Sequence, residues 1–101
     1  MSGGHFQYDQ YKIGYIADEV KRLILDNDST EKDEYGYEKG RHYPPEVIAR
    51  FKIAYLSLRE AQIAAQRIGW LVSGDDGPDT FLKRWQEDMN NLYKEARECP
   101  L

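Results

Sequence analysis

The sequence is poor in the residues that usually build metal and redox sites. It holds one cysteine, Cys99, and two histidines, His5 and His42, among 101 residues. A lone cysteine has no partner within the chain, so no internal disulfide supports the fold. Neither histidine has a second histidine or a cysteine at metal-ligand spacing, which argues against a zinc site. We therefore expect no histidine or cysteine metal centre.

Long apolar runs are also absent. No stretch of about 18 apolar residues occurs that could form a membrane-spanning helix, and residues 1–5 lack the basic start and apolar segment of a secretion signal. Apolar residues make up 41% and charged residues 32% of the chain, which is typical of a folded, soluble domain. We expect a single helical domain over residues 1–101, located in the cytoplasm.

Motifs for catalysis and for phosphate binding are missing as well. No serine lies in a Gly-x-Ser-x-Gly elbow, and no phosphate-binding loop or Rossmann glycine pattern is present. The net charge of −4 disfavours nonspecific binding to nucleic acid. We expect a protein that is not an enzyme and takes no cofactor. One alternative stays open, because Asp75, Asp76 and Asp79 offer oxygens to a metal-dependent hydrolase, although their turn lacks the EF-hand pattern.

Helical periodicity marks the first segment, over residues 9–27. Its apolar residues recur at spacings of three and four and are Ile13, Ile16, Val20, Leu23 and Ile24. Gly14 costs stability inside a helix, so it indicates a close backbone contact. Residues 26–44 are polar, charged and interrupted by glycine, and they predict a long loop whose second half can close as a small hairpin.

Pro44 and Pro45 open a long second helix, because proline suits the first turn. Spacings of four and three then run without interruption in a heptad seam. The seam consists of Val47, Phe51, Ala54, Leu58, Ala61, Ala65, Ile68 and Val72. Leu56, Ile63 and Trp70 form a second stripe that points almost opposite the first, at about 100° per residue.

A helix that is apolar on two sides must lie between partners. These partners are either the other helices of its own chain or helices of another subunit. We predict a homo-oligomer, a dimer in the simplest case, with Leu56, Ile63 and Trp70 at the interface. A monomer with the second helix sandwiched internally is the alternative.

The second helix is predicted to stop at residues 73–78, where Gly74 supplies a left-handed cap and Pro78 blocks continuation. Asp79 or Thr80 can cap a third helix that ends near Arg97. Its buried face is predicted to hold Phe81, Trp85, Met89, Leu92 and Tyr93. The sequence thus predicts an all-α fold of three main helices around a long central helix, with a long polar loop between the first two.

Tyrosine is abundant, with eight in the chain, and several fall outside the helical stripes. Aromatic rings with polar tips beside positive charge are typical of binding surfaces. The candidate binding residues are Phe6, Tyr8, Tyr37, Arg41 and Tyr43. Two alternatives stay open. The tyrosines can instead cover the edge of a small core, or the working surface can be the side of the second helix around Lys52, Arg59 and Gln66.

Three strings resemble a family of small proteins of bacteriophages and prophages. They are Ser2-Gly3-Gly4-His5-Phe6-Gln7-Tyr8-Asp9-Gln10-Tyr11, Tyr43-Pro44-Pro45-Glu46-Val47, and Arg67-Ile68-Gly69-Trp70-Leu71-Val72-Ser73-Gly74-Asp75-Asp76-Gly77. The resemblance implies a phage or mobile-element product of the bacterial cytoplasm and assigns no role to any residue. Our hypothesis is a non-enzymatic interaction protein that binds and inhibits or redirects a bacterial host protein, of the anti-defence type. The alternative is an oligomeric sponge for a nucleotide second messenger.

Overall fold

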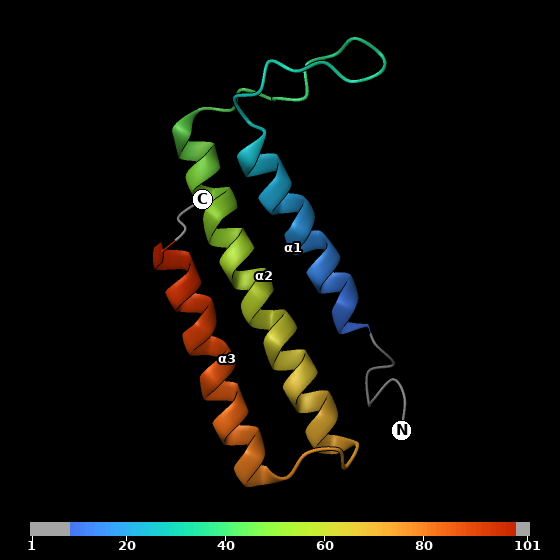
Figure 1. Cartoon of the computed structure of the whole chain (residues 1–101), viewed down its shortest axis with the longest axis vertical. Helices are drawn as coiled ribbons and strands as arrows, with labels where there is room; N and C mark the ends of the chain where they lie inside the picture. The colour runs from blue at the N-terminus through green and yellow to red at the C-terminus, as the bar shows by residue number, and fades with distance from the viewer. Residues whose placement is uncertain (1–8, 99–101) are drawn as a thin grey trace.

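The computed structural model describes residues 9–98 and shows the all-α fold that the sequence predicts. Within these residues three helices follow one another: α1 (Gln10–Leu25), α2 (Pro45–Val72) and α3 (Pro78–Glu98). Figure 1 shows α2 in the middle, with α1 along one side of it and α3 along the other. The long loop joins α1 to α2 at one end of the molecule, and a short turn joins α2 to α3 at the other end.

The ends of α2 follow the predicted chemistry. Pro44 is extended and Pro45 takes the first helical position, where its missing N–H leaves no hydrogen bond unmade. Beyond Val72, the chain turns at Gly74, whose φ of 85° is the left-handed conformation expected of a glycine cap. No helix of residues 9–98 is both long and apolar enough to cross a membrane.

The two shorter helices differ from prediction at their ends. α1 is shorter than the predicted 9–27, because the backbone N–H of Asp26 donates to the Arg22 carbonyl and that of Asn27 donates to the Ile24 carbonyl, which closes the helix. Asp79 and Thr80 were expected to cap α3, and this prediction is wrong. The helix begins at Pro78, so Asp79 already lies in its first turn. A proline therefore opens α3 as it opens α2.

A small apolar core joins α1 to α2. Its buried members are Ala17, Ile24 and Tyr55, and the half-buried residues around them are Val20, Ile48, Phe51 and Leu58. Gly14 is buried in the same contact, where an added Cβ would lie 2.7 Å from the side-chain nitrogen of Gln62. The predicted close approach at Gly14 is thus confirmed.

The contact between α2 and α3 combines apolar and polar groups. Met89 and Leu92 are buried on α3. Arg67 donates to Asp88 at 2.6 Å, and the Tyr93 hydroxyl donates to Glu60 at 2.6 Å. These two contacts fix the level of α3 along α2.

The three helices form an open layer and not a closed bundle. Among the described residues, no Cα atom of α1 comes within 8 Å of one in α3. The molecule measures 50 × 29 × 17 Å, so it is about one helix thick in its smallest dimension. Its radius of gyration is 16.8 Å, against about 12.7 Å for a compact domain of this length. Both broad faces of α2 therefore remain uncovered by its own chain.

The heptad seam that the sequence predicts does not form one continuous core within the chain. Phe51 and Leu58 pack against the α1 core. Ala54, Ala61 and Ile68 are exposed. The reason is geometric, since Phe51 and Leu58 lie on the edge of the stripe that α1 covers, and the three exposed residues lie on the edge that it leaves uncovered.

Candidate functional site

The loop between α1 and α2 is held at its base by one buried side chain. Asn27 is 6% exposed and sits just after α1. Its side-chain oxygen accepts from the backbone N–H of Tyr43 at 2.9 Å, and its side-chain nitrogen donates to the Tyr43 carbonyl at 3.1 Å. The Asn27 carbonyl also accepts from the N–H of His42 at 2.9 Å. Asn27 thus ties the two ends of the loop together.

Gly40 completes this base, because only a residue without a Cβ fits there. An added Cβ would lie 2.6 Å from the Asn27 carbonyl oxygen and would also collide with the backbone of Ser29. Next along the chain, His42 adopts a φ of 56°, which is uncommon for a residue other than glycine. We name the base formed by Asn27, Ser29, Gly40, His42 and Tyr43 the loop clasp.

Beyond the clasp the chain folds back as the small hairpin that the sequence allowed. Lys32 and Glu38 form an antiparallel bridge, and the Asp33 backbone N–H donates to the Tyr37 carbonyl at 2.8 Å. The Asp33 carboxylate accepts from the N–H groups of Tyr35 at 2.9 Å and Tyr37 at 3.1 Å. This is the side-chain turn that aspartate favours. The hairpin tip therefore has a defined backbone.

The tip presents two tyrosines to solvent. Tyr35 is 76% and Tyr37 is 73% exposed, and Figure 1 shows the hairpin projecting beyond the end of the helices. Tyr43 differs, because its ring packs edge-on against Phe51 with centroids 5.7 Å apart. Of the two interpretations of the tyrosines, core-edge packing fits Tyr43, and an exposed surface fits Tyr37.

The expected positive charge beside these rings is largely neutralised. Lys39 lies 3.6 Å from the Glu31 carboxylate, and His42 lies 2.6 Å from Glu38. Arg41 is exposed and remains the basic member of the predicted set. Residues 28–43 hold five acidic and three basic residues, so the loop is acidic as a whole. The five acids are Asp28, Glu31, Asp33, Glu34 and Glu38, and the bases are Lys32, Lys39 and Arg41.

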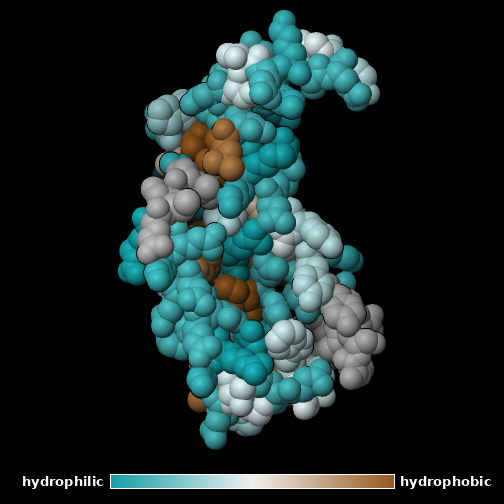
Figure 2. Space-filling view, viewed as in Figure 1, coloured by the Kyte–Doolittle hydropathy of each residue, from teal (hydrophilic) through white to brown (hydrophobic). Residues whose placement is uncertain are grey.

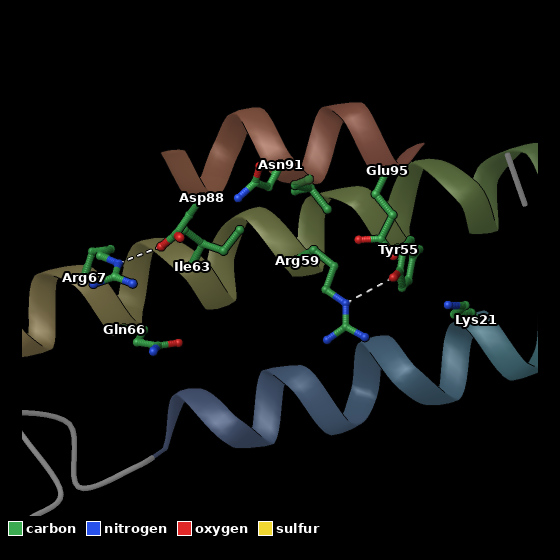
Figure 3. Close-up of a pocket in the computed structure, with 10 residues that line it drawn as sticks. Lys21, Tyr55, Arg59, Ile63, Gln66, Arg67, Asp88, Asn91 and Glu95 are labelled. Carbon is green, nitrogen blue, oxygen red and sulfur yellow. Dashed lines mark hydrogen bonds and ion pairs between the residues drawn. The ribbon is translucent and has the colours of Figure 1, made fainter. Parts of the chain in front are cut away.

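A second concave region crosses the middle of the layer. It is a groove of about 390 Å³ floored by α2 and walled by α1 and α3 (Figure 3). Its lining residues are Lys21, Tyr55, Arg59, Ile63, Gln66, Arg67, Asp88, Asn91, Leu92 and Glu95. Figure 2 views the same face, which is mostly hydrophilic with small apolar areas over α2. The groove is therefore a mostly polar cleft, with Ile63 and Leu92 as its aliphatic lining residues.

Arg59 is the best-held charge in the groove. Its Nε donates to the Tyr55 hydroxyl at 3.2 Å, one Nη donates to Gln62 at 2.9 Å, and the other pairs with Asp18. The guanidinium also lies over the Tyr55 ring, 5.2 Å from its centroid. Burial tends to lower the pKa of Arg59, but the hydrogen bonds with Tyr55 and Asp18 outweigh it, so the pKa is raised. Arg59 stays charged.

Arg67 occupies the other end of the groove. Besides its bond to Asp88, its guanidinium lies 4.8 Å from the centroid of the Trp70 ring. Its Nη1 atom is buried, and no residue of the described part of the chain hydrogen bonds to it. Lys21 and Glu95 face the groove from opposite walls (Figure 3), and neither has a hydrogen bond or ion pair with another described residue. The groove thus offers donors to a polar ligand.

Three of the five predicted binding residues, Tyr37, Arg41 and Tyr43, lie in the loop between α1 and α2. The other two, Phe6 and Tyr8, lie outside the described residues. Of the alternative surface on the second helix, Arg59 and Gln66 lie together in the groove, whereas Lys52 is not among the lining residues. Sequence reasoning missed Lys21, Arg67 and Asp88, because they come from three helices whose lateral order the periodicity does not fix.

The remaining sequence predictions fall on half-buried positions and on a turn. Leu56, Ile63 and Trp70 are half-buried, and Ile63 lines the groove. Their role as an oligomer interface stays a prediction. No group of three or more His, Cys, Asp or Glu side chains that could hold a metal ion occurs in residues 9–98. Asp75, Asp76 and Asp79 therefore do not gather into such a group.

The chain was compared with protein-family models, with curated proteins and with solved structures, and none of the three comparisons found a match. By its geometry, the described part of the chain is an open layer of three helices with a hairpin at one end. The loop clasp forms the base of this hairpin, and two exposed tyrosines lie at its tip.

Proposed function

We propose that this chain is a non-enzymatic interaction protein that binds a bacterial host protein through the hairpin at residues 28–43, and so inhibits or redirects it. The observation that carries the proposal is the exposure of Tyr35 and Tyr37 on a hairpin whose backbone is fixed. Aromatic side chains on a backbone that is already fixed lose less conformational freedom on binding than those on a mobile loop, and tyrosine is enriched among residues that dominate binding energy.

The charge of the hairpin favours a protein over a nucleic acid as its partner. Residues 28–43 carry more acidic than basic side chains, and phosphate backbones would be repelled by that excess. Arg41 adds a planar donor that pairs well with a carboxylate. A bacterial host is the source of the partner because of the phage-like strings in the sequence.

The experiment is capture from a bacterial lysate on the immobilised chain, followed by mass spectrometry and by titration with the purified partner. A double variant, Tyr37→Ala with Arg41→Ala, should bind the partner more weakly by at least about 1–2 kcal/mol. Its melting temperature should stay within a few degrees of the unchanged protein, because both side chains are exposed.

The matched control is Tyr15→Ala with Arg84→Ala, which removes the same two residue types from exposed positions on α1 and α3. The control should bind as the unchanged protein does. Equal binding by both double variants would contradict the proposal. Unfolding of the hairpin variant would show instead that its tyrosines belong to the core.

A second candidate function, sequestration of a nucleotide, is favoured by the groove. Lys21, Arg59 and Arg67 supply three positive charges along the groove, and Arg59 lies over the Tyr55 ring, so the groove suits a phosphate and a base. Against it, Asp18 and Asp88 already neutralise the two arginines.

Isothermal titration with linear and cyclic nucleotides tests this second function. Lys21→Ala should abolish binding, since Lys21 is a groove cation that pairs with no acidic side chain among residues 9–98, and Lys83→Ala on the exposed surface of α3 should not. If the unchanged protein did not bind nucleotide at millimolar concentration, nucleotide sequestration would be excluded.

A further inference from the structure

The face of the layer opposite the groove is apolar and uncovered. At about 100° per residue, Ala54, Ala61 and Ile68 fall on the side of α2 turned away from Arg59. All three are exposed. α1 adds Ile16, which is 55% exposed, and α3 adds Leu82, which is 66% exposed. We name this surface the back face.

The three helices contribute to the back face at a common level. Gly14 of α1 lies against Gln62, and Tyr93 of α3 bonds to Glu60. The neighbours of these residues, Ile16 and Ala61, therefore form a row across the layer with Tyr93. A row with a small residue at its centre lets another helix approach closely along α2.

The amount of exposed surface exceeds that of an ordinary monomer. The accessible surface is 7175 Å². A folded monomer of 11.8 kDa exposes about 5,900 Å², so the excess is about 1,300 Å². A standard interface takes about 800 Å² from each partner. The projecting hairpin and the open faces both contribute to this excess, which is larger than one partner's share of such an interface.

We propose that a second copy of this chain covers the back face, with the two α2 helices crossing antiparallel about a two-fold axis at Ala61. Ala54 and Ile68 lie seven residues to either side of Ala61. The antiparallel crossing therefore seats each Ile68 on the other copy's Ala54, and both contacts form at once. This self-complementarity is what a two-fold interface requires.

Charges at the ends of α2 match the same arrangement. Arg50 lies on the back face eleven residues before Ala61, and Asp75 lies in the turn fourteen residues after it. In the antiparallel crossing, each Arg50 comes opposite the end of the other α2, where its long side chain reaches the turn that holds Asp75. A parallel crossing would place each Arg50 beside its own copy, with like charges together.

The dimer is distinct from the interface predicted from the sequence and from the proposed function. In this dimer Leu56, Ile63 and Trp70 stay on the groove side of α2, outside the interface. It also places the two hairpins at opposite ends of the assembly, free for a protein partner. Failure of the dimer would therefore leave the hairpin proposal standing, and the reverse also holds.

Light scattering coupled to size exclusion tests the assembly on the full chain. We expect a mass near twice 11.8 kDa at tens of micromolar protein. Ala61→Glu should reduce the mass to one chain, because it places two like charges at the axis. The matched control, Gln66→Glu on the groove side, should keep two chains. A single-chain mass at every concentration, or equal behaviour of the two variants, would overturn the proposal.

Disulfide cross-linking fixes the orientation independently of any destabilised variant. In a Cys99→Ser background, Ala61→Cys should form a covalent dimer on mild oxidation, since residues at the axis meet their own copies within disulfide reach. Ala54→Cys should not, because the two copies of residue 54 stand about 21 Å apart along the antiparallel pair. Cross-linking of Ala54→Cys as efficiently as Ala61→Cys would refute the antiparallel crossing.

Discussion

A single side chain, that of Asn27, fixes the shape of the long loop between α1 and α2. Asn27 and Tyr43 are sixteen positions apart, yet the Asn27 side chain hydrogen bonds to both backbone groups of Tyr43. Closing a loop of this length costs conformational entropy, and the two hydrogen bonds that hold it closed are made by a buried side chain. The clasp therefore turns a polar segment into a hairpin with a fixed shape.

Replacing Asn27 with Ala should cost about 1–3 kcal/mol, because it leaves the backbone N–H and carbonyl of Tyr43 without partners. Urea denaturation gives the loss in unfolding free energy, and hydrogen exchange at the His42 amide should accelerate. Asn91→Ala is the control, since Asn91 is exposed on α3. A loss no larger than that of the control would mean that the clasp contributes nothing to stability.

Tyr93 provides a pH-dependent test of the contact between α2 and α3. The hydrogen bond to Glu60 raises the pKa of Tyr93 above its ordinary value, and burial adds to the rise. Because the pKa is raised in the folded protein, the contact stabilises the fold fully at pH values below the ordinary tyrosine pKa. This stabilisation is lost as the pH rises through the pKa that Tyr93 has in the folded protein. Glu60→Gln should therefore lower the pKa of Tyr93, as followed by the carbon-13 shift of its Cζ. If Tyr93 titrated at the same pH in both proteins, the result would contradict a hydrogen bond between Tyr93 and Glu60.

The residues of the hairpin show what sequence alone can and cannot predict at this scale. Tyr37 and Arg41 were named from composition and local charge, and the structure places both on the surface. The clasp was not predicted, because it depends on a contact between residues sixteen apart. Nor was the pairing of Lys39 with Glu31, which removes much of the positive charge that the sequence indicated.

At the scale of elements, periodicity gave the three helices and their approximate ends. Proline and glycine marked the limits of α2, since their effects are local to the backbone. Periodicity did not show which side of α2 each neighbour takes. Arg59 and Gln66 were listed only as an alternative surface, and the groove that contains them forms because α1 and α3 flank α2 without meeting.

Substitutions on the two sides of the α1 contact should separate core from surface. Leu58→Ala should cost about 2–4 kcal/mol, because Leu58 packs against the core of Ala17, Ile24 and Tyr55. Leu25→Ala removes the same group from an exposed site on α1 and should cost less than about 1 kcal/mol. Both values come from denaturant unfolding at one protein concentration. Equal costs would place Leu58 outside the core.

At the scale of the whole molecule, the open layer explains why so small a chain has several candidate surfaces. One face carries the polar groove, the other is the apolar back face, and the hairpin extends from one end. A closed bundle would bury α2 and leave only the hairpin. Every functional proposal for the two faces thus rests on the separation of α1 from α3.

Methyl and aromatic nuclear Overhauser contacts test that separation most directly. The open layer predicts contacts from Ile24 to the Tyr55 ring and none between the methyl groups of α1 and those of Met89 or Leu92 on α3. The antiparallel dimer preserves this result, because it stacks α1 on α1 and α3 on α3. Strong contacts between Val20 or Leu23 and Leu92 would show a closed bundle and contradict the account.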